Sequence, residues 1–107
     1  MQFFLNVIDF GMDLQTAIEA PKFSTPHSPT TFYPHDNHPG VLRIEDRIPN
    51  EVRDQLASRG HKIEVRPAWS EGHVLAVQLD TKTGVLAGGA DPRGQAIPVM
   101  PAQVIGW

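Results

Sequence analysis

Apolar residues recur at helical spacing in the first ten positions of the chain. Phe3, Val7 and Phe10 share one face of the predicted helix, and Phe4 and Ile8 lie beside it. Large apolar side chains therefore surround more than one side of this helix. A helix of that kind is normally buried on several sides. The pattern predicts that the opening helix must be covered by other polypeptide, and that the chain associates through it.

A turn and a second short helix are predicted next. Gly11 stands where a left-handed helix stop favours a residue without Cβ. Asp13 can accept hydrogen bonds from the free N–H groups at the start of the following helix. Pro21 cannot continue that helix. Its apolar face is formed by Leu14, Ala17 and Ile18. Residues 6–23 thus form a helix–turn–helix corner with one apolar side.

The periodic pattern stops between Ser24 and Gly40. This stretch contains four prolines and three histidines and has neither helical nor strand periodicity. It predicts a loop over 24–40 that is long for a compact domain, and such loops are functional or lie over a surface. The pair Phe32-Tyr33 predicts that an aromatic anchor pins the loop.

Alternation of apolar and polar residues resumes at Val41. Leu42 and Ile44 point to one side of a predicted strand, and Arg43 and Glu45 to the other. A helix is predicted over 50–59 and ends at Gly60. A further half-buried strand is predicted over 61–66, and Pro67 ends it.

The last predicted elements are two paired strands. Residues 74–79 are nearly all apolar, which predicts a strand covered on both faces. Residues 80–84 predict a hairpin loop in which Gly84 takes a positive φ. Residues 85–90 return as the paired strand. The small side chains at 87–90 predict that another element packs close against it.

Composition limits the class of protein. A chain of 107 residues, 40% hydrophobic and 20% charged, predicts one domain at most. The predicted helices and strands, which include an antiparallel hairpin, favour the α+β class. The net charge of −3, without a basic block, argues against nucleic acid as a partner. The chain has no cysteine. No apolar run approaches the ~20 residues of a membrane span, and no signal peptide is recognised at the N-terminus.

Several residue groups resemble sites without matching their spacing. His35 and His38, with His27 nearby, could hold zinc, but no third ligand has characteristic spacing and we predict no metal site. We interpret Gly88-Gly89 as part of a strand against which another element packs closely. It is not interpreted as a phosphate-binding loop, since no glycine-rich turn here leads into a helix. The remaining residue types known from nucleophilic catalysis fit no motif and are interpreted as structural. These are Thr30, Thr31, Ser70, His73 and Asp80.

Three blocks of the sequence resemble one enzyme family. The first block is VIDFGMDLQ at 7–15, continued by Ala17 and by the segment 19–23. The second is EDRIP at 45–49 with RGH at 59–61. The third is WSEG at 69–72, TGVL at 83–86, GADPRG at 89–94 and the final GW. In this order the blocks resemble the C-terminal part of the small subunit of γ-glutamyltransferases, which are N-terminal-nucleophile hydrolases.

The resemblance implies both a fold and a mechanism. The fold would be a slice of an αββα sandwich, with helices packed on antiparallel strands. The mechanism would use an N-terminal threonine that self-cleavage frees, with its own amine as the base. Paired glycine N–H groups would stabilise the oxyanion. In the family these elements precede the helix that opens this chain. We therefore assign no catalytic residue, metal or cofactor here.

The matched positions are instead assigned structural roles. These positions are Gly11, Asp13, Pro21, Gly84, Asp91, Pro92 and Arg93. The alternative for Arg93 is contact with a substrate carboxylate. Two positions depart from the family pattern. Lys22 stands where the family usually has arginine, which removes a planar donor. The tail from Gln95 to Ile105 is longer and richer in proline than expected.

We therefore predict a single partial domain over 1–107 that forms the scaffold of a γ-glutamyltransferase-like enzyme. Its partners would be an upstream segment of the same precursor, or a second copy bound through the first helix. The activity of the parent enzyme would be transfer or hydrolysis of glutathione-like γ-glutamyl amides. The alternative is a stand-alone binding module that reuses this part of the fold. Location stays open, because family members are often periplasmic or secreted and some are cytoplasmic.

Overall fold

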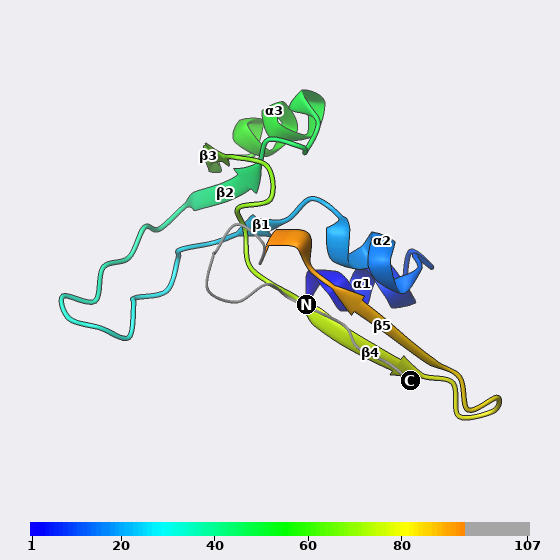
Figure 1. Cartoon of the computed structure of the whole chain (residues 1–107). Coiled ribbons are helices and arrows are strands. Elements are labelled where there is room, and N and C mark those ends of the chain that lie inside the picture. Colours follow the sequence, from blue (N-terminus) through cyan, green and yellow to red (C-terminus); the bar gives the residue numbers. More distant parts are fainter. Residues whose placement is uncertain (94–107) are drawn as a thin grey trace. The chain divides into compact units, whose positions relative to one another are not determined.

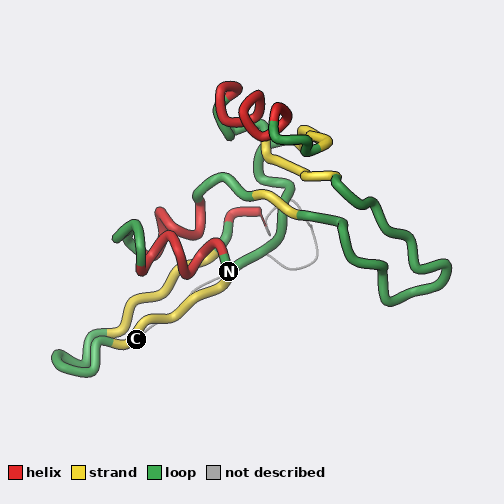
Figure 2. The backbone as a smooth tube through the Cα atoms, turned by 180° about the vertical axis from the view of Figure 1, so that it is seen from behind, coloured by secondary structure: helices red, strands yellow, loops and turns green. Residues whose placement is uncertain are grey.

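The computed structural model describes residues 1–93 and divides the chain into two compact units. The first unit contains residues 1–20 and the segment that begins at Gly72. The second unit contains residues 21–71. Figure 1 and Figure 2 show the elements of each unit. The tail from Gln95 to Ile105 lies outside the described residues.

The first unit places two helices on a β-hairpin. Helix α1 spans Gln2–Ile8 and α2 spans Leu14–Glu19. Strands β4 (Leu75–Leu79) and β5 (Leu86–Ala90) pair antiparallel, with Leu75 opposite Ala90 and Leu79 opposite Leu86. Helix α2 packs on β5 and also contacts α1.

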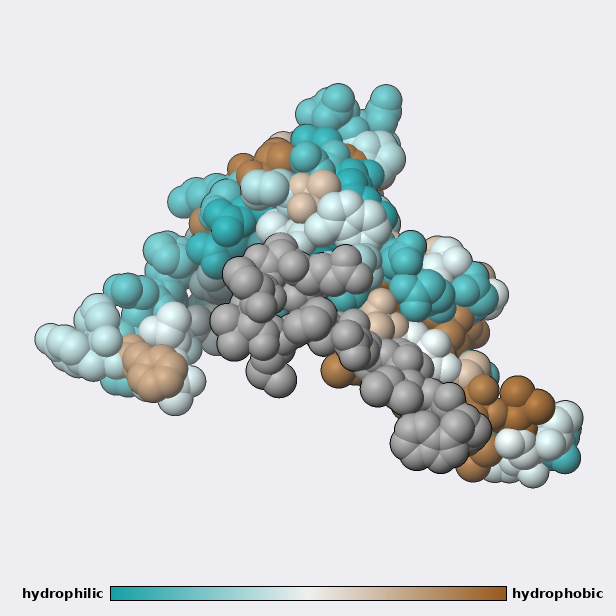
Figure 3. Space-filling view, viewed as in Figure 1, coloured by the Kyte–Doolittle hydropathy of each residue, from teal (hydrophilic) through white to brown (hydrophobic). Residues whose placement is uncertain are grey.

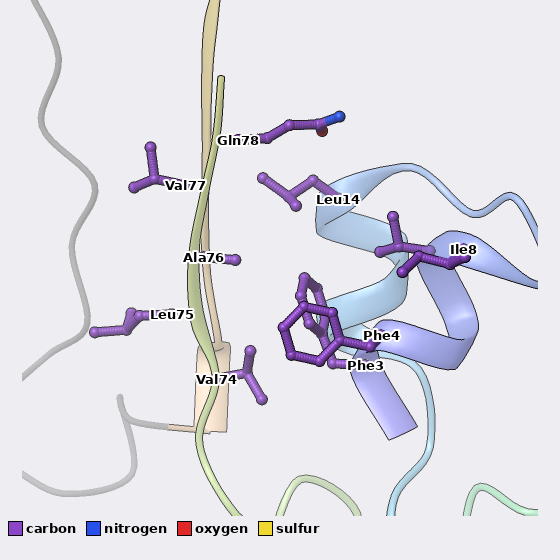
Figure 4. A pocket seen from close by; sticks show the side chains of 10 residues that line it. Phe3, Phe4, Ile8, Leu14, Val74, Leu75, Ala76, Val77 and Gln78 are labelled. Carbon is purple, nitrogen blue, oxygen red and sulfur yellow. The ribbon is translucent and has the colours of Figure 1, made fainter. Parts of the chain in front are cut away.

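Alternation along β4 gives the hairpin two different faces. Figure 4 shows Val74, Ala76 and Gln78 on the side of the helices, and Leu75 and Val77 on the opposite side. The residues on that opposite side are more than half exposed: Leu75, Val77, Leu79 and Leu86. Among the described residues, the helices lie against one face of β4, so the covering of its second face stays a prediction.

The second unit is a three-stranded sheet with one helix. Strand β1 (Phe23–Ser24) pairs antiparallel with β2 (Val41–Glu45), and β2 pairs parallel with β3 (Lys62–Arg66). Helix α3 spans Asn50–Ser58 and connects the two parallel strands. Leu42 and Ile44 of β2 are buried in the core of this unit.

The α+β class and the order of the predicted elements are confirmed, with boundaries within one or two residues. Two features of the second unit were not predicted. Strand β1 is only two residues long, and β2 and β3 pair in parallel, whereas the predicted antiparallel pairing is found for β4 with β5. Ser24 ends β1, and residues 25–40 form the loop that connects β1 to β2. Within residues 1–93, no helix is long and apolar enough to cross a membrane.

Candidate functional site

Arg93 follows β5 and is the largest fully buried side chain in the described part of the chain. Its guanidinium donates from Nη1 to the Ile18 carbonyl at 3.1 Å and from Nη2 to the Ala20 carbonyl at 3.0 Å. The last carbonyls of an α-helix have no partner within the helix, so Arg93 satisfies two acceptors at the end of α2. A cation is also favoured at this end of the helix dipole.

Asp91 is the counter-ion of Arg93 and is also buried. Its Oδ1 lies 3.0 Å from Arg93 Nη1 and accepts the Arg93 backbone N–H at 3.0 Å. Its Oδ2 accepts the backbone N–H of Val74 at 3.2 Å. Both side chains are buried and hydrogen-bonded to backbone groups, which favours a structural role over substrate contact. The assignment of Asp91, Pro92 and Arg93 stays a prediction.

In the helix–turn–helix corner, Gly11 and Asp13 have the turn conformation and the helix cap that were predicted for them. Gly11 has φ of 63°, in the left-handed region that glycine adopts without strain. The Asp13 carboxylate accepts the Thr16 backbone N–H at 3.1 Å and caps α2. Hydrogen bonds from the Thr16 hydroxyl and backbone hold the pKa of the exposed Asp13 carboxyl below its ordinary value. Gly84 has φ of 76° in the hairpin loop.

Gln15 connects α2 to β5 through its side-chain amide. Its Nε2 donates to the Ala90 carbonyl at 3.1 Å, and its Oε1 accepts the Ala90 N–H at 3.3 Å. The amide thus pairs with both backbone groups of a strand residue, as a neighbouring strand would. Gln15 belongs to the first family-like block, but the helical periodicity of that block did not predict its contact with Ala90.

Glu45 is a buried carboxylate that the sequence pattern did not single out. Its side chain is fully buried at the end of β2. Its Oε2 accepts the Lys22 N–H and its Oε1 accepts the Glu71 N–H, both at 3.2 Å. The Arg47 guanidinium lies 3.7 Å from Oε2, and it also stacks 3.6 Å from the centroid of the Trp69 ring. A buried charge needs such partners to offset the loss of hydration.

Three of the other candidate residues, Thr30, Ser70 and Asp80, have local partners. Ser70 donates to the Pro67 carbonyl, and Asp80 accepts the N–H groups of Lys82 and Thr83. The Thr30 hydroxyl donates to the Phe32 carbonyl in the long loop. Hydrogen bonding from the Lys82 backbone, with further bonds from Thr83, lowers the pKa of Asp80. These contacts are typical of turns.

The histidines of the long loop also make local contacts. The Gly40 N–H donates to His27 Nδ1 at 3.2 Å, and His35 Nδ1 lies 2.8 Å from the Thr30 carbonyl oxygen. The expected aromatic anchor is not in place here, because Phe32 and Tyr33 are among the most exposed large side chains. Across residues 1–93, no three His, Cys, Asp or Glu side chains are grouped to hold a metal ion.

An apolar hollow is found among the described residues of each unit. In the first unit a groove of about 460 Å³ lies between the helices and β4, and Figure 4 shows its lining side chains. Phe3, Phe4 and Leu14 form its helical wall, and Val74, Ala76 and Gln78 form its strand wall. In the second unit a pocket of about 380 Å³ lies beside α3 and is lined mainly by aliphatic residues of β2 and α3.

Comparison with known proteins places these features in context. Residues 1–100 match the sequence profile of the family described as gamma-glutamyltranspeptidase. The acylase ACY 1 proenzyme of a Pseudomonas species is 35% identical over 100 residues, which are 92% of this chain and 15% of that protein. The glutathione hydrolase proenzyme of Bacillus subtilis is 31% identical over 91 residues, which are 85% of this chain and 14% of that protein.

A solved structure agrees with the sequence matches. The crystal structure of a cephalosporin acylase from Bacillus halodurans superposes with a TM-score of 0.76 at 31% identity. The match covers 100% of this chain and 17% of that chain. The chain thus spans about 15% of the length of its curated relatives.

Proposed function

Because the chain belongs to the gamma-glutamyltranspeptidase family of N-terminal-nucleophile hydrolases, we propose that it is the C-terminal scaffold segment of an amide-cleaving enzyme. The catalytic groups would come from the upstream part of the same precursor. The two curated relatives named above are proenzymes and are several times longer than this chain, which supports a precursor origin. The chain itself would orient and cover that upstream part.

The observation that carries this proposal is the exposed apolar surface of the first unit. On α1 and just after it, Phe4, Ile8 and Phe10 are each more than 60% exposed. On the hairpin, the face that points away from the helices carries Leu75 and Val77 in the open. Figure 3 shows hydrophobic residues gathered toward the far end of the hairpin. Surfaces of this kind mark association sites.

The physical consequence is a stability deficit in the isolated chain. Burial contributes about 25 cal/mol per Å² of apolar surface, so one or two exposed phenylalanines forfeit roughly 2–5 kcal/mol. That amount is a large share of the about 5–15 kcal/mol by which a domain is stable. Upstream polypeptide that covers α1 and the outer hairpin face would restore it. In its absence a second copy of the chain would bind the same surface through α1.

The reaction we propose for the whole enzyme is transfer or hydrolysis of the acyl group of γ-glutamyl amides such as glutathione. A threonine at a new N-terminus would attack the amide carbonyl, with its own amine as base. A second candidate is hydrolysis of other acyl amides. The acylase relatives favour it, since they match this chain at 35% and 31% identity, as well as the glutathione hydrolase does at 31%.

A stand-alone binding module is the alternative from another class. The apolar groove between the helices and β4 is within the size range of small-molecule sites. In that case the chain would fold as a monomer and bind an apolar ligand without any upstream segment.

An activity assay tests the proposed function. We expect the pure chain not to hydrolyse a γ-glutamyl anilide above the uncatalysed rate. A chimeric precursor, in which this chain replaces the matching segment of the Bacillus subtilis proenzyme, should self-cleave and hydrolyse the anilide. Turnover by the isolated chain that survives replacement of both Thr30 and Thr31 would contradict the scaffold role.

A further inference from the structure

The chain crosses between its two units twice, after Ala20 and after Glu71. A crossing is a weak point of a fold, since the backbone there leaves one packed core before it enters the next. Backbone N–H and C=O groups near a crossing need partners of their own. The structure supplies those partners from buried charged side chains, separately in each unit.

In the second unit one carboxylate serves both crossings. Glu45 accepts the N–H of Lys22, just after the first crossing, and the N–H of Glu71, just before the second. The two bonds use different oxygens of the same group, and each is 3.2 Å long. Lys22 and Glu71 are therefore held to a common point, although 48 other residues separate them in the chain.

In the first unit the Asp91–Arg93 pair likewise binds backbone groups beside both crossings. Arg93 binds the carbonyls of Ile18 and Ala20, just before the first crossing. Asp91 binds the N–H of Val74, just after the second crossing. The ion pair at 3.0 Å joins the two ends to each other.

These three side chains are the buried charged residues found within residues 1–93. Burying a charge is unfavourable unless hydrogen bonds and counter-charges offset it, so its occurrence needs a reason. Here each buried charge has backbone groups next to a crossing among its partners. Only Pro21 lies between the held groups at the first crossing, and only Gly72 and His73 lie between them at the second.

We propose that Glu45 and the Asp91–Arg93 pair are matched positioning clamps, each of which fixes both crossings at the edge of its own unit. Each clamp acts within its unit and holds the crossing backbone whatever happens in the other unit. Bending of the connections is thereby confined to Pro21, Gly72 and His73. Gly72 already has φ of 63°, in the region open to glycine. The clamps are independent of the reaction that the whole enzyme performs.

Amide hydrogen exchange on the full chain tests this proposal. Glu45→Gln keeps the size of the side chain but leaves only one accepting oxygen. Loss of a hydrogen bond to a charged group should speed exchange at Lys22 or Glu71 by about 10- to 100-fold. The amides of Val74 and Arg93 should change by less than about twofold, since sites without shared partners respond independently. Asp91→Asn should speed exchange at Val74 or Arg93 and should change the amides of Lys22 and Glu71 by less than about twofold.

Glu64→Gln is the matched control, because Glu64 is a partly exposed glutamate of the neighbouring strand that pairs with Arg43. The proposal is overturned if Glu45→Gln speeds exchange at Lys22 and Glu71 no more than Glu64→Gln does. It is also overturned if Glu45→Gln affects Val74 as strongly as Lys22. The unmodified chain gives a test that requires no variant to fold. Its Lys22 and Glu71 amides should be protected, and exchange of both at the rate of free peptide would disprove the clamp.

Discussion

Gly89 lies directly against Ile18. A methyl group at the Cβ position of residue 89 would sit 2.5 Å from Ile18 Cδ1, closer than real Cβ contacts come. Ile18 is fully buried in α2, so its side chain has little room to move away. The same methyl group would lie 3.2 Å from Gln15 Oε1, which accepts the Ala90 N–H. The absence of a side chain at residue 89 thus lets α2 pack on β5.

Gly89→Ala should therefore destabilise the first unit. Overpacking of a close-packed contact typically costs about 1–3 kcal/mol, and we expect a loss in that range. Denaturant unfolding, monitored by circular dichroism, measures it. Leu86→Ala is a suitable control in the same strand, because the Leu86 side chain is 68% exposed and its loss should change stability little.

A second substitution identifies the cause. Ile18→Val removes the Cδ1 atom that the new methyl group would meet. The cost of Gly89→Ala should then be clearly smaller in the Ile18→Val background than in the unmodified chain, as expected for residues in contact. Equal costs in both backgrounds would show that the contact between residues 18 and 89 is not the reason.

Asp13 should make the stability of α2 depend on pH in the acid range. Its pKa is lowered by hydrogen bonds from Thr16, so the ionised form is favoured in the folded chain. The resulting stabilisation is present above the unfolded-state pKa and is lost as pH falls through the folded-state value. Melting temperatures measured from pH ~5 down to ~2.5 should fall for this reason.

Asp13→Ser separates the charge from the cap. Serine can still accept the Thr16 N–H, since both residue types are favoured N-caps, but it does not ionise. The variant should keep α2 and lose this part of the acid dependence. An unchanged pH profile in the serine variant would mean that other carboxyl groups account for the acid response.

How much of this molecule was predictable from the sequence depends on the range of the contacts. Gly11 and Asp13 act within one turn of chain, and the structure gives them the expected φ and hydrogen bond. The small residues at 87–90 correctly predicted a close approach, which occurs at Gly89. Local chemistry determined these features, so a local pattern could reveal them.

Glu45 illustrates what the pattern could not reveal. Alternation placed it beside Arg43 on the polar side of β2, yet it is fully buried. Its burial depends on the backbone of Lys22 and Glu71, which are remote in sequence. The same limit applies to β1, which exists only because Phe23 and Ser24 pair with β2. Periodicity within a segment carries no information about such partners.

Zinc should not stabilise the chain. The histidines near the loop tip and base have local partners, and no group of three ligands was found within residues 1–93. A ligand that binds only the folded form at a hundred times its Kd would add about 2.7 kcal/mol. We expect no rise in Tm with a modest excess of zinc. A rise that His38→Ala abolishes would show that the loop does hold the metal.

The first unit presents an exposed apolar surface, and we propose that the upstream part of a precursor covers it. Sedimentation velocity of the isolated chain over a range of concentrations tests it most directly. We expect concentration-dependent association, which Phe4→Ser and Ile8→Ser on α1 should reduce. A well-folded monomer at every concentration, with both substitutions neutral for solubility and sedimentation, would show that the chain closes its own core and would contradict the claim.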